Sequence, residues 1–247
     1  MSIASAISAL QSASSDIATA IAKKGVIVPS GSGFNDYASL IAQIGKDLSY
    51  VQNGLVLHLD GINQGGTSGL WTSLVGNTYY TLNTHSTSES NAIVMDGSGL
   101  ITATNPITNV TYSTGTIEIC ADYLGTGSGA IYYGRADSMA VVVGGSGYAF
   151  GNASSNNFWT ITKQSKMLLS MNSARCVLNG TSGGTLGSNS WSAGTAYTIG
   201  GRSVGGNMYY ANVRIYAIRI YNRQLSENEM IANQRIDNIR FNLGLTL

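Results

Sequence analysis

The first 24 residues carry apolar side chains at the spacing of a helix. Six positions follow one another at intervals of four and three: Ile3, Ile7, Leu10, Ser14, Ile17 and Ile21. This spacing makes a heptad seam on one face of the helix. The β-branched residues of the seam favour a bundle of three helices over a bundle of two. A lone helix of this length is marginal in water, so the seam must be covered. It packs either on its own chain or on other copies, and we favour self-association.

A second, shorter helical pattern runs from about Asn35 to Ile44. Gly25 follows the first pattern, at the position where helices commonly end. Residues 1–45 therefore predict a small helical module, which is too short to be robust alone and is interpreted as an anchor and oligomerisation module. Residues 46–53 are interpreted as a linker.

From residue 54 onward the pattern changes to short alternating segments. Leu55, Leu57 and Leu59 alternate with more polar neighbours, as do the apolar residues of Ile117–Tyr123. The other predicted strands are Tyr79–Leu82, Ala92–Met95, Ala130–Tyr133, Met139–Val143, Phe158–Thr162, Met167–Met171, Arg175–Leu178 and Tyr197–Gly200. Turn residues recur between them at the spacing of a β-sandwich. Residues 54–247 are thus predicted to be a mainly β domain.

The end of the chain combines a long strand with a helix. In Val213–Tyr221 the apolar residues change face near Ala217. Val213, Ile215 and Ala217 are predicted on one side, and Ile218 and Ile220 on the other. Either a β-bulge or burial of both faces explains the change. Ser226 and Glu229 have the spacing of a capping box, which predicts a final short helix.

The composition limits the classes of function that the chain can have. Only 10% of the residues are charged, against roughly 25% in ordinary soluble proteins, which hints at a place within a large assembly. The net charge of +1 and the single basic doublet, Lys23 and Lys24, argue against a nucleic-acid partner. No apolar run is long enough to predict membrane insertion, and the interrupted, periodic N-terminal pattern differs from a secretion signal.

Few residues suggest nucleophilic or metal chemistry. Cys120 and Cys176 lack metal-like spacing and are interpreted as buried free thiols, with a single disulfide as the alternative. His58 and His85 have no Gly-x-Ser-x-Gly elbow beside them, and we interpret both as structural or solvent-facing residues rather than members of a catalytic triad.

The β region resembles concanavalin A-like jelly rolls of the laminin-G type. Gly54–Asp60 (GLVLHLD) and Trp71–Leu74 resemble the opening of that fold, and Arg214–Arg223 (RIYAIRIYNR) with Leu225–Glu229 resembles its closing strand and helix. The resemblance covers about residues 53–241. It implies a concanavalin A-like jelly-roll β-sandwich with a short C-terminal helix, preceded by the small N-terminal α-helical module.

The N-terminal module resembles a short segment of bacteriophage tail and fibre proteins. The matching positions are Lys24-Gly25-Val26, Val28-Pro29, Asp36-Tyr37-Ala38 and Leu40-Ile41-x-x-Ile44. In those proteins the segment serves for attachment or oligomerisation. The two resemblances together imply a phage virion protein, made in the bacterial host cytoplasm and displayed on the virion surface.

Glycoside hydrolysis is the enzymatic option on this fold, and it requires two carboxylates about 5–10 Å apart. Retaining glucanases with this fold carry Glu-x-Asp-x-Glu or a close variant on one strand. The nearest match is Glu118-Ile119-Cys120-Ala121-Asp122, with Cys120 in place of the central Asp. Glu118 and Asp122 share a face that we predict to be polar and outward, where such pairs arise by chance, so we expect no enzymatic activity.

The resemblance also implies a candidate calcium site, because laminin-G-like modules often bind calcium through oxygen-rich loops. Asp60, Asp96 and Asp137 are the candidates next to loops, but no spacing motif joins them. We therefore assign no metal ligand and no cofactor.

Sugar binding needs an aromatic platform for the apolar sugar face and polar partners for the hydroxyls. Two Gly-rich stretches, 144–159 and 200–210, combine such residues. The candidate ligand-binding residues are Tyr148, Asn152, Asn157, Trp159, Arg202 and Tyr209. The alternative is that the aromatic side chains fill the core and the Asn and Gly residues form turns.

We therefore predict a non-enzymatic virion protein, a homotrimer joined through Ile3, Ile7, Leu10, Ile17 and Ile21. The helical module would dock on other virion proteins, and the jelly roll would bind bacterial surface polysaccharide. One alternative is a capsid decoration or head-fibre protein without a dedicated ligand. Another is a polysaccharide depolymerase.

Overall fold

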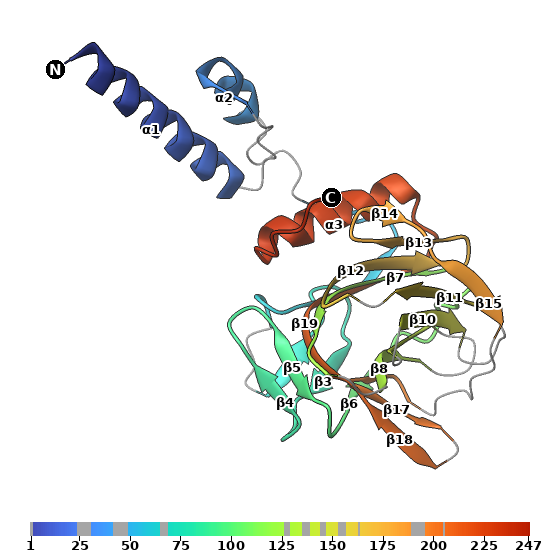
Figure 1. The fold of residues 1–247 in the computed structure, drawn as a ribbon. Helices are drawn as coiled ribbons and strands as arrows, with labels where there is room; N and C mark the ends of the chain where they lie inside the picture. Colours follow the sequence, from blue (N-terminus) through green and yellow to red (C-terminus); the bar gives the residue numbers. More distant parts are fainter. Residues whose placement is uncertain are drawn as a thin grey trace.

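The chain folds into an antiparallel β-sandwich that carries two N-terminal helices and one C-terminal helix (Figure 1). The computed structural model describes residues 2–23, 31–41, 49–64, 69–125, 129–134, 139–143, 147–152, 157–162, 164–188, 196–204 and 206–247. The predicted mainly β class is confirmed. No helix within these ranges is long and apolar enough to span a membrane.

The first sheet has the strand order β14-β13-β12-β7-β19-β5-β4, and β1 also pairs with the long strand β19. Its strands are β1 (Leu55–Asp60), β4 (Ser86–Ser88), β5 (Ile93–Asp96), β7 (Thr116–Tyr123), β12 (Lys166–Asn172), β13 (Arg175–Leu178), β14 (Thr181–Ser182) and β19 (Asn212–Tyr221). β7 and β19 pair over most of their length and form the middle of the sheet.

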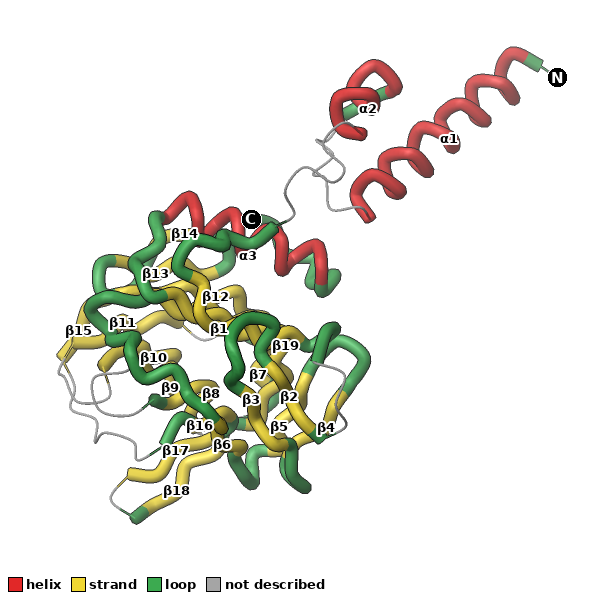
Figure 2. Tube along the Cα trace, turned by 180° about the vertical axis from the view of Figure 1, so that it is seen from behind, coloured by secondary structure: helices red, strands yellow, loops and turns green. Residues whose placement is uncertain are grey.

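The second sheet has the order β15-β11-β10-β9-β8-β16-β6-β3-β2. Its strands are β2 (Leu70–Thr72), β3 (Tyr79–Thr81), β6 (Ile101–Thr104), β8 (Gly129–Tyr133), β9 (Met139–Val143), β10 (Gly147–Asn152), β11 (Asn157–Thr162), β15 (Thr185–Ser188) and β16 (Thr198–Ile199). A separate hairpin, β17 (Gly201–Val204) and β18 (Asn207–Tyr210), extends beside β8. Figure 2 shows the two sheets facing each other.

The core lies between the sheets, where alternate side chains of each strand meet. Leu57 and Leu59 from one sheet and Trp71 and Tyr80 from the other are almost completely buried there. The Trp71 indole satisfies its N–H by donating to the backbone carbonyl of Asp60 at 3.1 Å. Cys120 and Cys176 are buried free thiols, as predicted. Burial raises the pKa of Cys176 to about 12.

The phase change in β19 has both of the predicted explanations. The pairing register with β7 shifts between Ile215 and Ala217, which marks a β-bulge. Because of the bulge, Tyr216 and Ala217 both belong to the outer cluster beneath the C-terminal helix, while Ile215 and Ile218 both enter the inner core. Ala217 therefore does not share a face with Ile215, whereas Ile218 and Ile220 do, which corrects the predicted assignment.

Helix α3 (Glu227–Arg240) covers the outer face of the first sheet. The predicted capping box is confirmed, since Ser226 and Glu229 cap each other's backbone N–H. Glu118 lies beneath this helix and is only 1% exposed, so the outward polar face that we predicted for it is wrong. The sheet face is polar because it pairs with polar residues of α3. Arg219 of β19 donates to Glu118 of β7 at 2.9 Å and to Asp237 of α3.

The N-terminal helices α1 (Ile3–Lys23) and α2 (Phe34–Ile41) contact each other. Tyr37 packs on Ile21 and Ile17, and its hydroxyl donates to the Ser14 carbonyl at 2.8 Å. α2 thus covers the C-terminal half of the predicted seam. The N-terminal half stays exposed, with Ile3 82%, Ile7 51% and Leu10 59% accessible. Both views show these helices projecting away from the sandwich (Figures 1 and 2).

Residues 49–53, in the predicted linker, contact the sandwich and α3. The Tyr50 side chain is buried, and the backbone N–H of Val51 donates to the Asn233 side chain at 3.0 Å. Arg223 donates to the carbonyl of Asn53 at 2.8 Å. The chain therefore reaches β1 along a defined path over the C-terminal helix.

Candidate functional site

The structure separates the predicted ligand residues into two groups. Trp159 on β11 packs against the core, and its indole N–H donates to the carbonyl of Asn172 at 3.0 Å. That contact joins the two sheets, so Trp159, which is partly buried, has a structural role. Tyr148, Asn152 and Asn157 lie on the paired strands β10 and β11, and their side chains are outside the described part of the structure.

Arg202 and Tyr209 are brought together, as directly opposed residues of the β17–β18 hairpin. The Arg202 guanidinium lies 5.2 Å from the centre of the Tyr209 ring and 5.7 Å from that of Tyr133. The hairpin approaches β8 closely at Gly129, where a Cβ would meet the Tyr210 backbone at 2.2 Å. This cluster holds the hairpin on the second sheet through cation–π contacts.

The three calcium candidates do not converge. Asp60 is buried and accepts from the backbone N–H groups of Ile62 and Asn63, and its other oxygen pairs with Arg240. Asp96 pairs with His85 at 3.1 Å, which lowers the pKa of Asp96 despite the opposing effect of desolvation. Asp137 is outside the described residues. Where the chain is described, no three His, Cys, Asp or Glu residues are placed to hold a metal ion.

The carboxylates considered for hydrolysis are engaged in structural contacts. Glu118 accepts from Arg219, Asn233 and Ser170 beneath α3. Burial raises the pKa of Glu118, and Arg219 partly offsets that rise. Asp122 accepts from the Tyr216 hydroxyl at 2.7 Å. A polysaccharide cannot reach Glu118 while α3 covers it.

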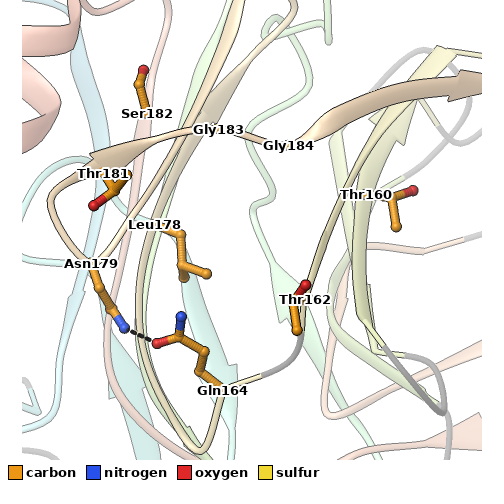
Figure 3. Close-up of a pocket in the computed structure, with 9 residues that line it drawn as sticks. All are labelled: Thr160, Thr162, Gln164, Leu178, Asn179, Thr181, Ser182, Gly183 and Gly184. Atoms are coloured by element: carbon orange, nitrogen blue, oxygen red, sulfur yellow. Dashed lines mark hydrogen bonds between the residues drawn. The ribbon is translucent and has the colours of Figure 1, made fainter.

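A groove of about 520 Å³ opens where the edge strands of the two sheets come together. It is lined by Thr160, Thr162, Gln164, Leu178, Asn179, Thr181, Ser182, Gly183 and Gly184 (Figure 3). Its volume falls within the range of about 300–1,000 Å³ that is usual for small-molecule sites. We call it the edge groove.

Three parts of the chain build the edge groove. Thr160 and Thr162 extend from β11 on one side, while Leu178 and Thr181 stand on the β13–β14 hairpin opposite (Figure 3). Between them the chain crosses from the first sheet to the second through Gly183 and Gly184. The groove therefore depends on the two sheets having a common edge.

Asn179 fixes the hairpin wall. It has a positive φ of 49°, in the left-handed region that Asn tolerates better than most residues. Its side-chain oxygen accepts from the N–H of Leu168 at 2.8 Å, and its amide donates to Gln164 at 2.5 Å and to the carbonyl of Lys166 at 3.2 Å. These bonds pin the turn to β12 and to the segment before it.

The groove offers hydrogen bonding, and the lining contains no carboxylate, imidazole or thiol. The side chains of Thr160, Thr162, Thr181 and Ser182 are exposed. Hydroxyl groups both donate and accept, as sugar hydroxyls do. Leu178, which also packs on the core, supplies the one apolar contact surface.

The pattern of aromatic residues among glycines does not point to this groove, because none of its lining residues is aromatic. The usable signal was Asn179-Gly180-Thr181-Ser182-Gly183-Gly184, a polar turn followed by two glycines. That signal does not reveal that β11 lies opposite, since the strand pairing that places it there is long-range.

Comparison with known proteins shows the fold. No protein-family model matches the chain, and no curated protein matches it in sequence. A Trypanosoma rangeli sialidase solved with sialic acid matches at TM-score 0.52 and 14% identity, over 92% of this chain and 38% of the sialidase. The same sialidase as a covalent intermediate matches at 0.55 and 12%, over 91% and 38%.

A point mutant of HCR/D matches at TM-score 0.54 and 10% identity, over 75% of this chain and 52% of that one. The chain thus spans well under two thirds of each of these proteins. The expectation of a non-enzymatic protein is contradicted, because sialidases are enzymes and a fold found within them gives no ground for excluding catalysis. What the comparisons establish is a β-sandwich fold shared with the sialidase and with HCR/D.

Proposed function

We propose that this chain binds polysaccharide through the edge groove, with bacterial surface polysaccharide as the ligand. The observation that carries the proposal is the lining: four exposed hydroxyl side chains, two amides and a glycine pair around one leucine. A pocket of this composition suits a ligand that is covered with hydroxyls. Structural neighbours that include a sialidase solved with sialic acid are consistent with a saccharide ligand.

The same proposal places the chain on a phage virion as a receptor-binding protein. It is supported by the resemblance of the N-terminal module to tail and fibre segments and by the projection of α1 and α2 away from the sandwich. A homotrimer joined through α1 would carry three grooves. Weak contacts on one stalk reinforce one another, because the second contact becomes intramolecular.

Binding of the purified full-length chain to isolated bacterial surface polysaccharides tests the proposal. The double variant Thr162→Val with Thr181→Val removes one hydroxyl from each wall and should weaken binding at least tenfold. Thr102→Val with Thr104→Val is the matched control, since both residues are exposed on β6, far from β11 in the same sheet. Equal losses in the two double variants would refute the groove as the binding site.

The same mixtures should be assayed for released reducing ends. Binding without release would identify an adhesin, whereas release that scales with protein concentration would identify a depolymerase. The second result would place catalysis outside Glu118, which α3 covers.

A further inference from the structure

We infer that the edge groove takes an uncharged saccharide, so that its ligand is a neutral polysaccharide rather than one bearing sialic or uronic acids. This inference rests on the proposed function and specifies the ligand class for the same groove.

The lining residues carry no charge. All nine are Thr, Ser, Asn, Gln, Gly or Leu. Within the described part of the chain, the hydroxyls of Thr160, Thr162, Thr181 and Ser182 make no hydrogen bond, whereas the Asn179 amide is already engaged. The groups that can receive a ligand are therefore neutral hydroxyls, each able to donate or accept.

An anionic sugar would meet no compensating charge from this lining. A carboxylate that loses hydration on binding needs a cation or several strong donors to replace it. Lys166, on neighbouring β12, instead donates to the carbonyl of Leu243 at 2.8 Å. Lys163, between two lining residues in the sequence, lies outside the described residues, and the experiment below therefore includes it.

A cationic ligand is disfavoured as well. None of the nine lining residues is Asp or Glu, so the lining offers a cation no carboxylate. Neither sign of ligand charge would thus find an opposite charge on the groove walls, and a neutral, hydroxylated polymer remains the best chemical match.

Gly183 gives a way to block the groove without disturbing the fold. A Cβ added at this position would have nothing within 4 Å, and its φ is not in the left-handed region. A leucine side chain there would begin in open space at the groove wall rather than displace neighbours. Gly33, next to α2, also has an open Cβ position and an ordinary φ, so Gly33→Leu is the matched control.

The test is binding of the full-length wild type, Gly183→Leu, Gly33→Leu and Lys163→Gln to an array of neutral and acidic glycans, with melting temperatures to verify folding. The wild type, Gly33→Leu and Lys163→Gln should bind neutral glycans such as dextran and mannan fragments. Gly183→Leu should bind them with an affinity at least tenfold lower. Thr162→Val provides a second, less bulky lesion if Gly183→Leu fails to fold.

The outcomes separate the two proposals. The opposite result is that the wild type binds polysialic acid or polygalacturonate and that Gly183→Leu or Lys163→Gln loses this binding. This result would overturn the assignment to neutral saccharides while keeping the groove as the binding site. Binding that Gly183→Leu and Thr162→Val both leave unchanged, or no binding to any glycan, would overturn the groove itself and with it the proposed function.

Discussion

The hydroxyl of Tyr50 donates a 2.8 Å hydrogen bond to the carboxylate of Asp237, across 187 positions of sequence. The Tyr50 ring also lies 4.0 Å from the Arg219 guanidinium and meets His58 edge-on at 5.0 Å. This one side chain ties the segment that follows the helical module to both the first sheet and α3. It therefore sets the path by which the chain enters the sandwich.

Tyr50→Phe should lower the free energy of unfolding by about 1–3 kcal/mol, because Asp237 loses a buried donor. The ring contacts with Arg219 and His58 should persist. Urea denaturation measures the change. Tyr79→Phe, on a half-buried tyrosine of β3, is the control and should change stability by less than about 0.5 kcal/mol. Equal losses in both variants would contradict a specific role for the Tyr50–Asp237 bond.

Arg219→Met should be far more damaging than the same change at Arg214. Arg219 is 1% exposed between Glu118 and Asp237, and its removal leaves two buried carboxylates facing each other, at a cost of about 3–5 kcal/mol. Arg214 pairs with Glu89 where both side chains are about a third exposed, and such pairs contribute below about 1 kcal/mol. Adding Glu118→Gln and Asp237→Asn to Arg219→Met should recover part of the loss in chemical denaturation.

The buried His58 should make the protein less stable in mild acid. Burial and the nearby positive charges of Arg219 and Arg240 lower the pKa of His58 to about 3. The negative charge of Asp60 raises this pKa, but its effect is smaller. The unfolded chain, with a His pKa of about 6.5, then binds the proton more readily. Stability should be fully present above about pH 6.5 and should fall towards pH 3, by at most about 1.4 kcal/mol per pH unit from this group.

The variant His58→Gln tests the pH dependence. Its thermal midpoint should vary less than that of the wild type between pH 6.5 and pH 4. His85→Gln is the control, because His85 and its partner Asp96 are both more than 40% exposed. An unchanged slope in His58→Gln would show that other groups cause the acid sensitivity.

Ile3→Asp with Ile7→Asp should dissociate any oligomer formed through α1 without unfolding the helical pair. Both residues are exposed, whereas Ile17 and Ile21 pack against Tyr37 of the same chain. Sedimentation should give a mass above the 25.8 kDa chain for the wild type and the chain mass for the variant. A wild type of single-chain mass would rule out self-association.

The control for the seam is a double variant that adds the same two charges elsewhere on α1. Ser5 and Ser8 are exposed and lie off the seam, so Ser5→Asp with Ser8→Asp should keep the larger mass. Dissociation of this control as well would attribute the effect to added charge rather than to the seam.

Gln234→Ala should weaken saccharide binding as well as stability. The Gln234 side chain accepts from the N–H of Gly180 at 2.8 Å and donates to the carbonyl of Val177 at 3.0 Å, so α3 supports the turn that carries Asn179 and Thr181. Ser226→Ala weakens the same helix at its cap by about 0.5–2 kcal/mol without touching that turn. Polysaccharide affinity should therefore fall in Gln234→Ala and stay near wild type in Ser226→Ala. Equal polysaccharide affinities of the two variants would show that the Gln234 contacts of α3 do not support the groove.

Local rules within the sequence determined the helices, most strands, the capping box at Ser226 and Glu229, and the phase change near Ala217. Those features depend on periodicity or on neighbours within a few residues, which the sequence shows directly. The mainly β class followed from the same patterns. The bulge itself reassigned Ala217, because one extra residue reverses which side of the sheet the next side chain faces.

Only the tertiary structure decided which polar and aromatic side chains are accessible. Glu118 has the alternation of a surface residue in the sequence, but α3 covers it in the structure. The bond from the Trp159 indole to Asn172 likewise has no signal in the sequence. The edge groove joins Thr162 to Thr181 through the edge that two sheets share. Such relations come from contacts between distant segments, whose free energy depends on burial and packing that no local pattern records.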